Sequence, residues 1–316
     1  MTRRWAAWAV PGATLTLAAV ATVVVLAPVV AGYLLGGLPA ALCIGLGFLT
    51  TLRSAIFLRP AHAAGLVLPS VMAGTVAVAL RGQPLAAACF VALCCLLVAP
   101  AGMIADGLLS ALPTSVAVLL LVPGDFDPVR TAFWLLVGAA LMVAMATRLP
   151  RAPRAPGLEQ ARAWRHAAVT ALATGAVVYL VAMWQVPHGY WVALTLTVVL
   201  RPFDDQTMKK ASERVLGTIG GGLLALVAAL LLPLPGVLVL LVVCTVLSFA
   251  YAMASDYVRE VFFLTPSVVL LGSAGANPAL LASERTLATL AGALIAGGIA
   301  LGLARLDTRP PAPEVA

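Results

Sequence analysis

Long hydrophobic runs, separated by short polar or charged stretches, recur along the whole chain. Most of them approach the length of about 17–25 residues with which a helix crosses a hydrocarbon core of roughly 30 Å. The runs are continuously apolar and rich in Ala, Leu and Gly, whereas a membrane β-barrel needs alternating segments around a polar lumen. The pattern therefore predicts twelve transmembrane helices, at 12–32, 34–51, 62–80, 84–104, 107–122, 130–147, 165–186, 189–201, 214–232, 236–253, 258–274 and 284–304.

The composition agrees with an all-α integral membrane protein that has no sizeable soluble domain. Of the 316 residues, 62% are hydrophobic and 10% are charged. A soluble domain carries about 25% charged residues because its surface must meet water. This chain has too few charged residues to cover such a surface.

The placement of the basic residues predicts the orientation of the chain in the membrane. With the N-terminus in the cytoplasm, sixteen of the 19 Lys and Arg residues fall in inner loops, and the outer loops keep Arg81, Arg130 and Arg285. This is a strong positive-inside bias. We therefore expect a multi-pass protein of the cytoplasmic membrane with both termini in the cytoplasm, and the net charge of +7 does not indicate nucleic-acid binding.

Features that recur on either side of the Pro- and Arg-rich stretch 148–157 predict two six-helix repeats. Arg53 and Arg201 close the second and eighth runs, and Arg130 and Arg285 open the sixth and twelfth. Repeats with an even number of spans keep one orientation, so their axis should lie along the membrane normal and leave a substrate path at the seam. The expected units are a first repeat 1–149, a cytoplasmic linker 150–163, a second repeat 164–308 and a short cytoplasmic tail 309–316.

The apolar segment between His188 and Arg201 is unusually short, at about 18 Å of helix against a core of roughly 30 Å. Short or interrupted spans of this kind point to binding sites in transporters. The spacing of His188, Trp191 and Thr195 predicts that they share one helix face, which with Tyr190 and Arg201 would suit an aromatic or carboxylate-bearing ligand. The alternative is an aromatic belt at the outer interface.

A charged segment follows this short helix. Pro202 should end the helix, and 203–207 should form a cytoplasmic turn. Asp204, expected to pair with Arg201, could gate the inner mouth or relay protons together with Asp205, Arg214, Asp106 and Asp256, because ionisable groups at membrane depth are commonly functional. The alternative is a solvated loop, which is the preferred interpretation for Lys209 and Lys210.

Small residues recur every fourth position on two of the predicted helices. Gly217, Gly221 and Ala225 form one such stripe, and Gly292 belongs to another. Small side chains allow close helix approach within lipid, so we expect packing faces. The five cysteines lie in apolar runs without metal-ligand spacing, and no nucleotide-binding or hydrolase motif occurs. We therefore expect no metal, no cofactor and no enzymatic activity.

One stretch carries a recognisable motif. It comprises His188-Gly-Tyr-Trp191, Thr195, Arg201-Pro202, Asp204, Thr207, Arg214, Gly217-Thr218 and Gly221-Gly222. This pattern closely resembles the signature of the fusaric acid resistance and aromatic acid exporter family. The resemblance covers about forty residues firmly, and the first half keeps only Arg53 and Gly65 of it. Larger members carry a soluble cytoplasmic domain, whereas the linker and tail here are short.

The resemblance implies proton-driven export of aromatic or other small organic acids through paired six-helix blocks. Two alternatives remain: a passive organic-anion channel, and a non-transporting scaffold or accessory subunit for envelope assembly. The expected partners are the lipid bilayer, a small organic anion and a possible second copy of the chain. The resemblance supplies no defined set of catalytic residues.

Overall fold

The computed structural model describes residues 11–147, 156–272 and 277–307, and every regular element in these ranges is a helix. There are eleven helices in this part of the chain. They are α2 (Gly12–Phe57), α3 (Pro60–Ala79), α4 (Pro84–Ile104), α5 (Ala111–Leu121), α6 (Pro128–Ala146), α7 (Gln160–Trp184), α8 (Tyr190–Val199), α9 (Asp204–Leu231), α10 (Leu234–Met253), α11 (Tyr257–Gly272) and α12 (Pro278–Asp307).

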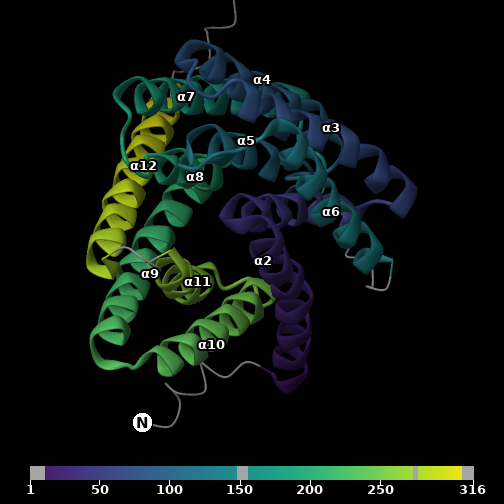
Figure 1. The fold of residues 1–316 in the computed structure, drawn as a ribbon. Coiled ribbons are helices and arrows are strands. Elements are labelled where there is room, and N and C mark those ends of the chain that lie inside the picture. The colour runs from purple at the N-terminus through teal and green to yellow at the C-terminus, as the bar shows by residue number, and fades with distance from the viewer. Residues whose placement is uncertain (1–10, 148–155, 273–276, 308–316) are drawn as a thin grey trace, which may run out of the picture.

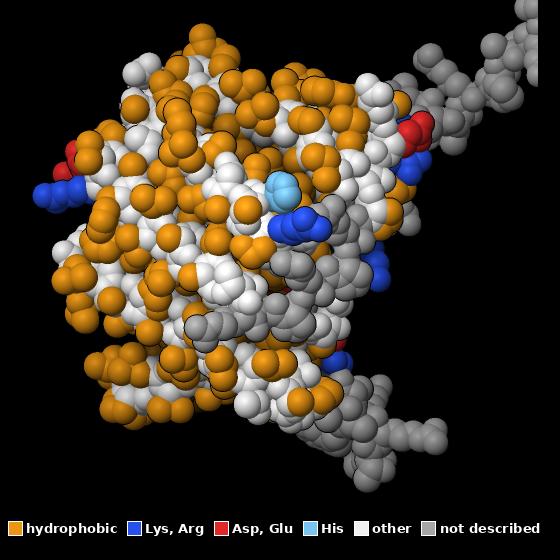
Figure 2. Space-filling view, turned by 90° about the vertical axis from the view of Figure 1, so that its right-hand side faces the viewer, with side chains coloured by type: hydrophobic (Ala, Val, Ile, Leu, Met, Phe, Trp, Pro, Cys, Tyr) orange, Lys and Arg blue, Asp and Glu red, His pale blue; other side chains and the backbone are white. Residues whose placement is uncertain are grey.

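The predicted class is confirmed: this is a multi-pass helical membrane protein. Eight of the described helices are long and apolar enough to cross a membrane, and α5 and α8 are shorter apolar helices. Large aliphatic side chains are exposed, including Leu34, Leu172 and Leu294, each more than 70% exposed. Hydrophobic side chains far outnumber charged ones on the face in Figure 2, as expected of a surface in contact with lipid.

The first two predicted spans follow each other without a loop, as two helical segments of α2 that meet at a kink. Gly37 interrupts α2 with a φ of 71°, a conformation that glycine adopts without steric cost. The helical segments on either side of Gly37 pack together. Gly32 and Ile44 are so close that a Cβ placed on Gly32 would collide with the side chain of Ile44. With α2 counted as one element, the described residues form eleven helices, so the expected count of twelve is not confirmed.

Several helix boundaries follow from local chemistry. Proline occupies the first position of α3, α4 and α6, where its missing N–H costs no hydrogen bond. The Asp127 carboxylate accepts a hydrogen bond from the Arg130 backbone N–H at 2.8 Å and caps α6. Helix α8 ends before Pro202, as predicted from the steric restriction that proline imposes on the preceding residue.

The two shortest helices, α5 and α8, pack against each other in the interior of the bundle (Figure 1). Around them, α4 packs along α7, α6 along α2, and α9 along both α11 and α12. Helix α10 contacts α11 and also α2. The largest hydrophobic core joins the two halves, since it contains Val116 and Leu119 of α5 together with Leu196 and Val199 of α8.

Several predicted boundaries differ from the structure. Helix α5 covers 111–121 and not 107–122, because Gly107 adopts a φ of 74° in the turn after α4. Helix α9 begins at Asp204, so the expected turn 203–207 and the loop lysines belong mostly to a helix. Charged residues lowered the hydropathy of this first part of the helix and made it resemble a loop. Helix α7 begins at Gln160, inside the predicted linker 150–163; the first part of that linker, 150–155, and the tail 309–316 lie outside the described residues.

Candidate functional site

The turn between α7 and α8 carries His188. Gln185 and His188 both have a φ of 52°, so the chain reverses through left-handed residues before α8 begins at Tyr190. His188 therefore precedes the helix and does not share a helical face with Trp191 and Thr195, which corrects the spacing argument. Its Nδ1 lies 2.7 Å from a carboxylate oxygen of Glu284 in α12.

The aromatic residues at the start of α8 surround a buried arginine. The ring centroids of Tyr190 and Trp191 lie 4.7 Å apart. The guanidinium carbon of Arg285 lies 4.2 Å from the Trp191 ring centroid, and Tyr190 and Glu284 are close enough to act on each other electrostatically. The sequence assigned Arg285 to an outer loop, but it belongs to α12 and is only 2% exposed.

Glycines hold α8, α9, α11 and α12 close together. A Cβ on Gly292 would lie 2.8 Å from Thr195 Cβ, which leaves α12 in direct contact with α8. A Cβ on Gly217 would lie 2.7 Å from the Val258 carbonyl oxygen, and one on Gly221 would collide with the backbone of Phe262, both in α11. Ala225 is fully buried in a cluster with Val269 and Ala282. These small residues lie at helix–helix contacts.

The turn from α8 to α9 is fixed by Thr207. Its hydroxyl oxygen accepts a hydrogen bond from the Arg201 backbone N–H at 3.0 Å and lies 3.2 Å from the Phe203 carbonyl oxygen, to which it can donate. Thr207 is 1% exposed, so these bonds are shielded from water. The side chains of Asp204 and Asp205 lie outside the described residues, so the expected Arg201–Asp204 pair stays a prediction.

Six ionisable side chains from α2, α9, α11 and the turns that follow α4 and α8 interact electrostatically. We call them the inner cluster: Arg53, Asp106, Arg201, Lys210, Arg214 and Glu260. Burial lowers the pKa of Arg201, and the charge of Arg53 acts in the same direction, whereas Tyr257 and Asp106 raise it. Lys210 lies over the Tyr257 ring, 4.1 Å from its centroid, and interacts electrostatically with Glu260. The cluster therefore draws together residues of both halves of the chain.

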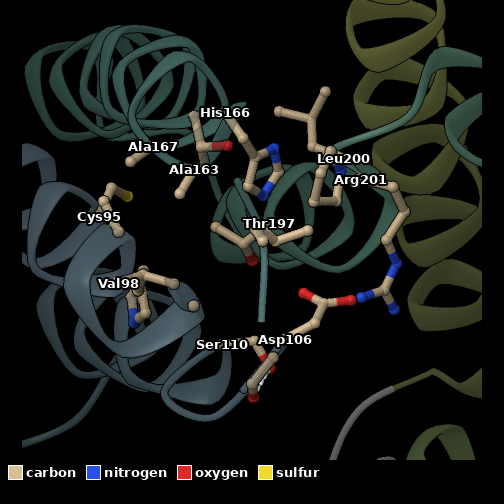
Figure 3. Close-up of a pocket in the computed structure, with 17 residues that line it drawn as sticks. Cys95, Val98, Asp106, Ser110, Ala163, His166, Ala167, Thr197, Leu200 and Arg201 are labelled. Atoms are coloured by element: carbon tan, nitrogen blue, oxygen red, sulfur yellow. Dashed lines mark hydrogen bonds between the residues drawn. The ribbon is translucent and has the colours of Figure 1, made fainter. Parts of the chain in front are cut away.

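A cavity adjoins this cluster between α4, α7 and the end of α8 (Figure 3). Its polar lining comes from Asp106, Ser110, His166, Thr197 and Arg201, and its apolar lining includes Cys95, Val98, Ala163, Ala167 and Leu200. In Figure 3 the Asp106 carboxylate points toward the Arg201 guanidinium. A second cavity, lined by Thr207 and Ile299, shares His166 and Arg201 with the first. Sequence reasoning overlooked His166, because nothing nearby along the chain marks it.

Two arginines of the second half are buried inside the bundle. Arg214 is 5% exposed and donates a hydrogen bond from Nη1 to the Tyr257 hydroxyl at 2.9 Å. Arg285 and Arg214 interact electrostatically, and neither is in an ion pair with a described carboxylate. The family signature includes Arg214, whereas no signal in the sequence indicated the burial of Arg285.

The other residues considered in the sequence, Asp256, Lys209 and the cysteines, have local structural roles or no partner cluster within the described part of the chain. The Asp256 carboxylate accepts from the Arg259 backbone N–H at 3.2 Å and lies 2.9 Å from its guanidinium, so it caps α11. Lys209, 76% exposed in its side chain, lies 3.9 Å from Glu213 one turn later in α9. Four cysteines are buried and Cys89 is exposed, and among the described residues no cluster could hold a metal ion.

Comparison with known proteins identifies a segment of the second half that contains Arg201, Arg214 and Arg285. Residues 172–297 match the family described as fusaric acid resistance protein-like, which confirms the resemblance over this segment. An uncharacterized protein of Synechocystis sp., slr1298, is 33% identical over 126 residues, or 38% of this chain. Inner membrane protein YccS of Escherichia coli is 34% identical over 110 residues, or 34% of this chain. The matched segments span 16% and 15% of these relatives' lengths, and no solved structure matches the chain.

Proposed function

We propose that this chain, with its fusaric acid resistance protein-like segment, is a secondary exporter of small organic acids across the cytoplasmic membrane. The observation that carries the proposal is the excess of cations inside the bundle. Among the side chains that the structure describes, the inner cluster holds Arg53, Arg201, Lys210 and Arg214 with two carboxylates, and the buried Arg285 adds a further cation. Ionisable groups among membrane helices commonly line the path of a charged substrate. This excess of positive charge would attract the anionic form of an organic acid.

The polar side chains form a continuous series that could carry such an anion. Arg201 interacts with Tyr257, Tyr257 binds Arg214, and both act on Arg285. Arg285 interacts in turn with Tyr190 beside the His188–Glu284 pair. In the orientation expected from the basic residues, this series runs from the cytoplasmic cavity to the outer end of α8. We therefore assign His188, Tyr190, Trp191, Thr195 and Arg201 to the substrate path.

The cytoplasmic end of this series of polar side chains is the proposed gate. In the absence of substrate, Asp106 and the predicted partner Asp204 neutralise part of the Arg201 charge. An incoming carboxylate competes with them, because the planar guanidinium binds carboxylates through two parallel hydrogen bonds. Asp106 and His166 line the same cavity as Arg201 and are the proposed proton carriers.

We also propose that the halves are parallel repeats related by an axis along the membrane normal. The helix contacts support this: α3 packs on α5 and α6 as α9 packs on α11 and α12. Across the halves, α4 packs on α7 as α10 packs on α2. Arg53 and Arg201, which close equivalent runs, interact with each other, as residues at the same end of an axis would.

Transport by purified protein in liposomes tests the proposal. A panel of radiolabelled aromatic and aliphatic acids is offered to proteoliposomes and to empty liposomes prepared alike. Faster, saturable uptake of at least one acid into the proteoliposomes supports export. Equal rates for every acid would favour the alternative of a scaffold or accessory subunit. Transport that follows only the electrochemical gradient of the anion would favour a passive channel.

A further inference from the structure

Resting on the proposed function, we propose that Arg214 and Arg285 form a carboxylate-binding site inside the bundle, distinct from the inner cavity beside Arg201. Both arginines are more than nine-tenths buried, at 5% and 2% exposure. Removing a charge from water costs several kcal/mol per ion unless a partner compensates it. Because no described carboxylate pairs with either arginine, an anionic ligand is the partner that would compensate both.

The free polar atoms around this pair are hydrogen-bond donors. Arg285 Nε and Nη1 and Arg214 Nε are buried without a hydrogen-bond partner among the described residues. The same holds for Trp191 Nε1 and for the hydroxyl groups of Thr195 and Thr218. Buried polar groups in native proteins are nearly always hydrogen-bonded, so a set of unpaired donors calls for an acceptor. An anion supplies acceptor oxygens and negative charge together.

Contacts link Trp191, Arg285 and Arg214, and the two threonines lie one helical turn along from Trp191 and Arg214. Arg285 lies over the Trp191 ring, and Arg285 and Arg214 interact electrostatically. Thr195 is one turn after Trp191 on α8 and contacts α12 at Gly292. Thr218 is one turn after Arg214 on α9, where small residues again allow close approach to α11 and α12.

The nearby acidic and phenolic side chains that the structure describes do not form ion pairs with Arg214 or Arg285, so both arginines can still bind an anion. Glu284 precedes Arg285 but its carboxylate lies 2.7 Å from His188. Glu260 interacts with both Lys210 and Arg214 without forming an ion pair with either. The Tyr257 hydroxyl accepts a hydrogen bond from Arg214 Nη1, and the side chains of Tyr190 and Tyr257 lie near Arg285. The site therefore takes a small carboxylate, with Trp191 and Tyr190 available to contact a ring.

Direct binding of benzoate to purified protein in detergent tests the site separately from transport. Radiolabelled benzoate should bind wild type, be displaced by unlabelled benzoate, and resist displacement by neutral benzamide. Arg285→Gln should weaken binding at least about tenfold, since charge-assisted hydrogen bonds are lost. The matched control is Arg130→Gln, which changes the exposed arginine that opens α6 and should leave affinity unchanged.

Thermal unfolding distinguishes a binding role from a structural one. Because a buried unpaired charge destabilises the fold, ligand-free Arg285→Gln should unfold at the wild-type temperature or above, and benzoate should no longer raise that temperature. If Arg285→Gln does not fold, Arg285→Lys keeps the charge without the planar fork and should weaken benzoate binding at least about threefold.

Wild-type affinity in Arg285→Gln or in Arg285→Lys would overturn the site. Binding of chloride but not of benzoate by wild type would also overturn it. If the wild-type protein transports an acid in liposomes but both variants bind benzoate as tightly as wild type, the site is wrong and the proposed function still holds. Failure of wild type both to transport and to bind any organic acid removes the proposed function itself.

Discussion

The hydroxyl oxygens of Thr114 and Thr197 lie 2.8 Å apart and join the two shortest helices of the bundle, α5 and α8. Thr197 Oγ1 also lies 3.0 Å from the Ala193 carbonyl oxygen, to which it donates. Thr114 is then the donor to Thr197. The bond connects a helix of the first half to one of the second, directly beside the cavity that Thr197 lines.

A double-mutant cycle measures the strength of this bond. Thr114→Val and Thr197→Val should each destabilise the protein, and their coupling energy should be about 0.6 kcal/mol, the average for side-chain hydrogen bonds between membrane helices. Unfolding in detergent gives the free energies. Thr75→Val combined with Thr197→Val is the control, because Thr75 bonds only to its own helix, at Val71. A coupling energy of zero for Thr114 and Thr197 would show that the bond contributes nothing.

The contact between α8 and α12 depends on Gly292. Gly292→Ala would bring a methyl group to 2.8 Å from Thr195 Cβ and 3.0 Å from the Val192 carbonyl oxygen, so the helices must separate. We expect a loss of about 1–3 kcal/mol, as for other over-packed interiors. The matched control is Gly298→Ala on the same helix, where a Cβ meets no atom within 4 Å. Equal melting temperatures for the two variants would contradict the assigned contact.

The proposed inner gate predicts unequal effects of its charged residues. Arg201→Lys should lower export because an ammonium group cannot bind a carboxylate through two parallel hydrogen bonds. Asp204→Asn and Asp106→Asn should each disturb export more than the control Asp205→Asn. The measurement is efflux of a radiolabelled aromatic acid from cells with matched protein levels. Wild-type rates in Arg201→Lys, Asp204→Asn and Asp106→Asn would remove this cluster from the transport path.

The expected topology can be tested by cysteine labelling in a variant without native cysteines. Gln83 and Glu159 are both exposed and lie in the α3–α4 connection and before α7. With the positive-inside orientation, an impermeant maleimide added to intact cells should label Gln83→Cys and leave Glu159→Cys unlabelled. Permeabilised cells should label both, which controls for reactivity. The reverse labelling pattern would show that the protein has the opposite orientation in the membrane.

The sequence predicted features that depend on neighbouring residues along the chain, such as a short helix and where it ends. The short segment 189–201 was found because its apolar length and Pro202 are read directly along the chain, and α8 covers Tyr190–Val199. The depth of Arg285 depends on how α12 packs against α8, which no local signal contains. For the same reason the meeting of His166 with Asp106 and Arg201, from three separate segments, was not foreseen. His188 was misplaced by two residues, because its left-handed backbone delays the start of the helix.

Proton-coupled export is the central claim, and flux into proteoliposomes with an acidic lumen tests it most directly. Potassium and valinomycin on both sides hold the membrane potential at zero, and radiolabelled 4-hydroxybenzoate is added outside at equal concentration to the lumen. Passive diffusion of the neutral acid moves it toward the alkaline exterior, whereas exchange for protons concentrates it inside. The account predicts transient accumulation in the lumen that a protonophore abolishes. Equal or lower luminal concentrations, matching those of empty liposomes, would contradict it.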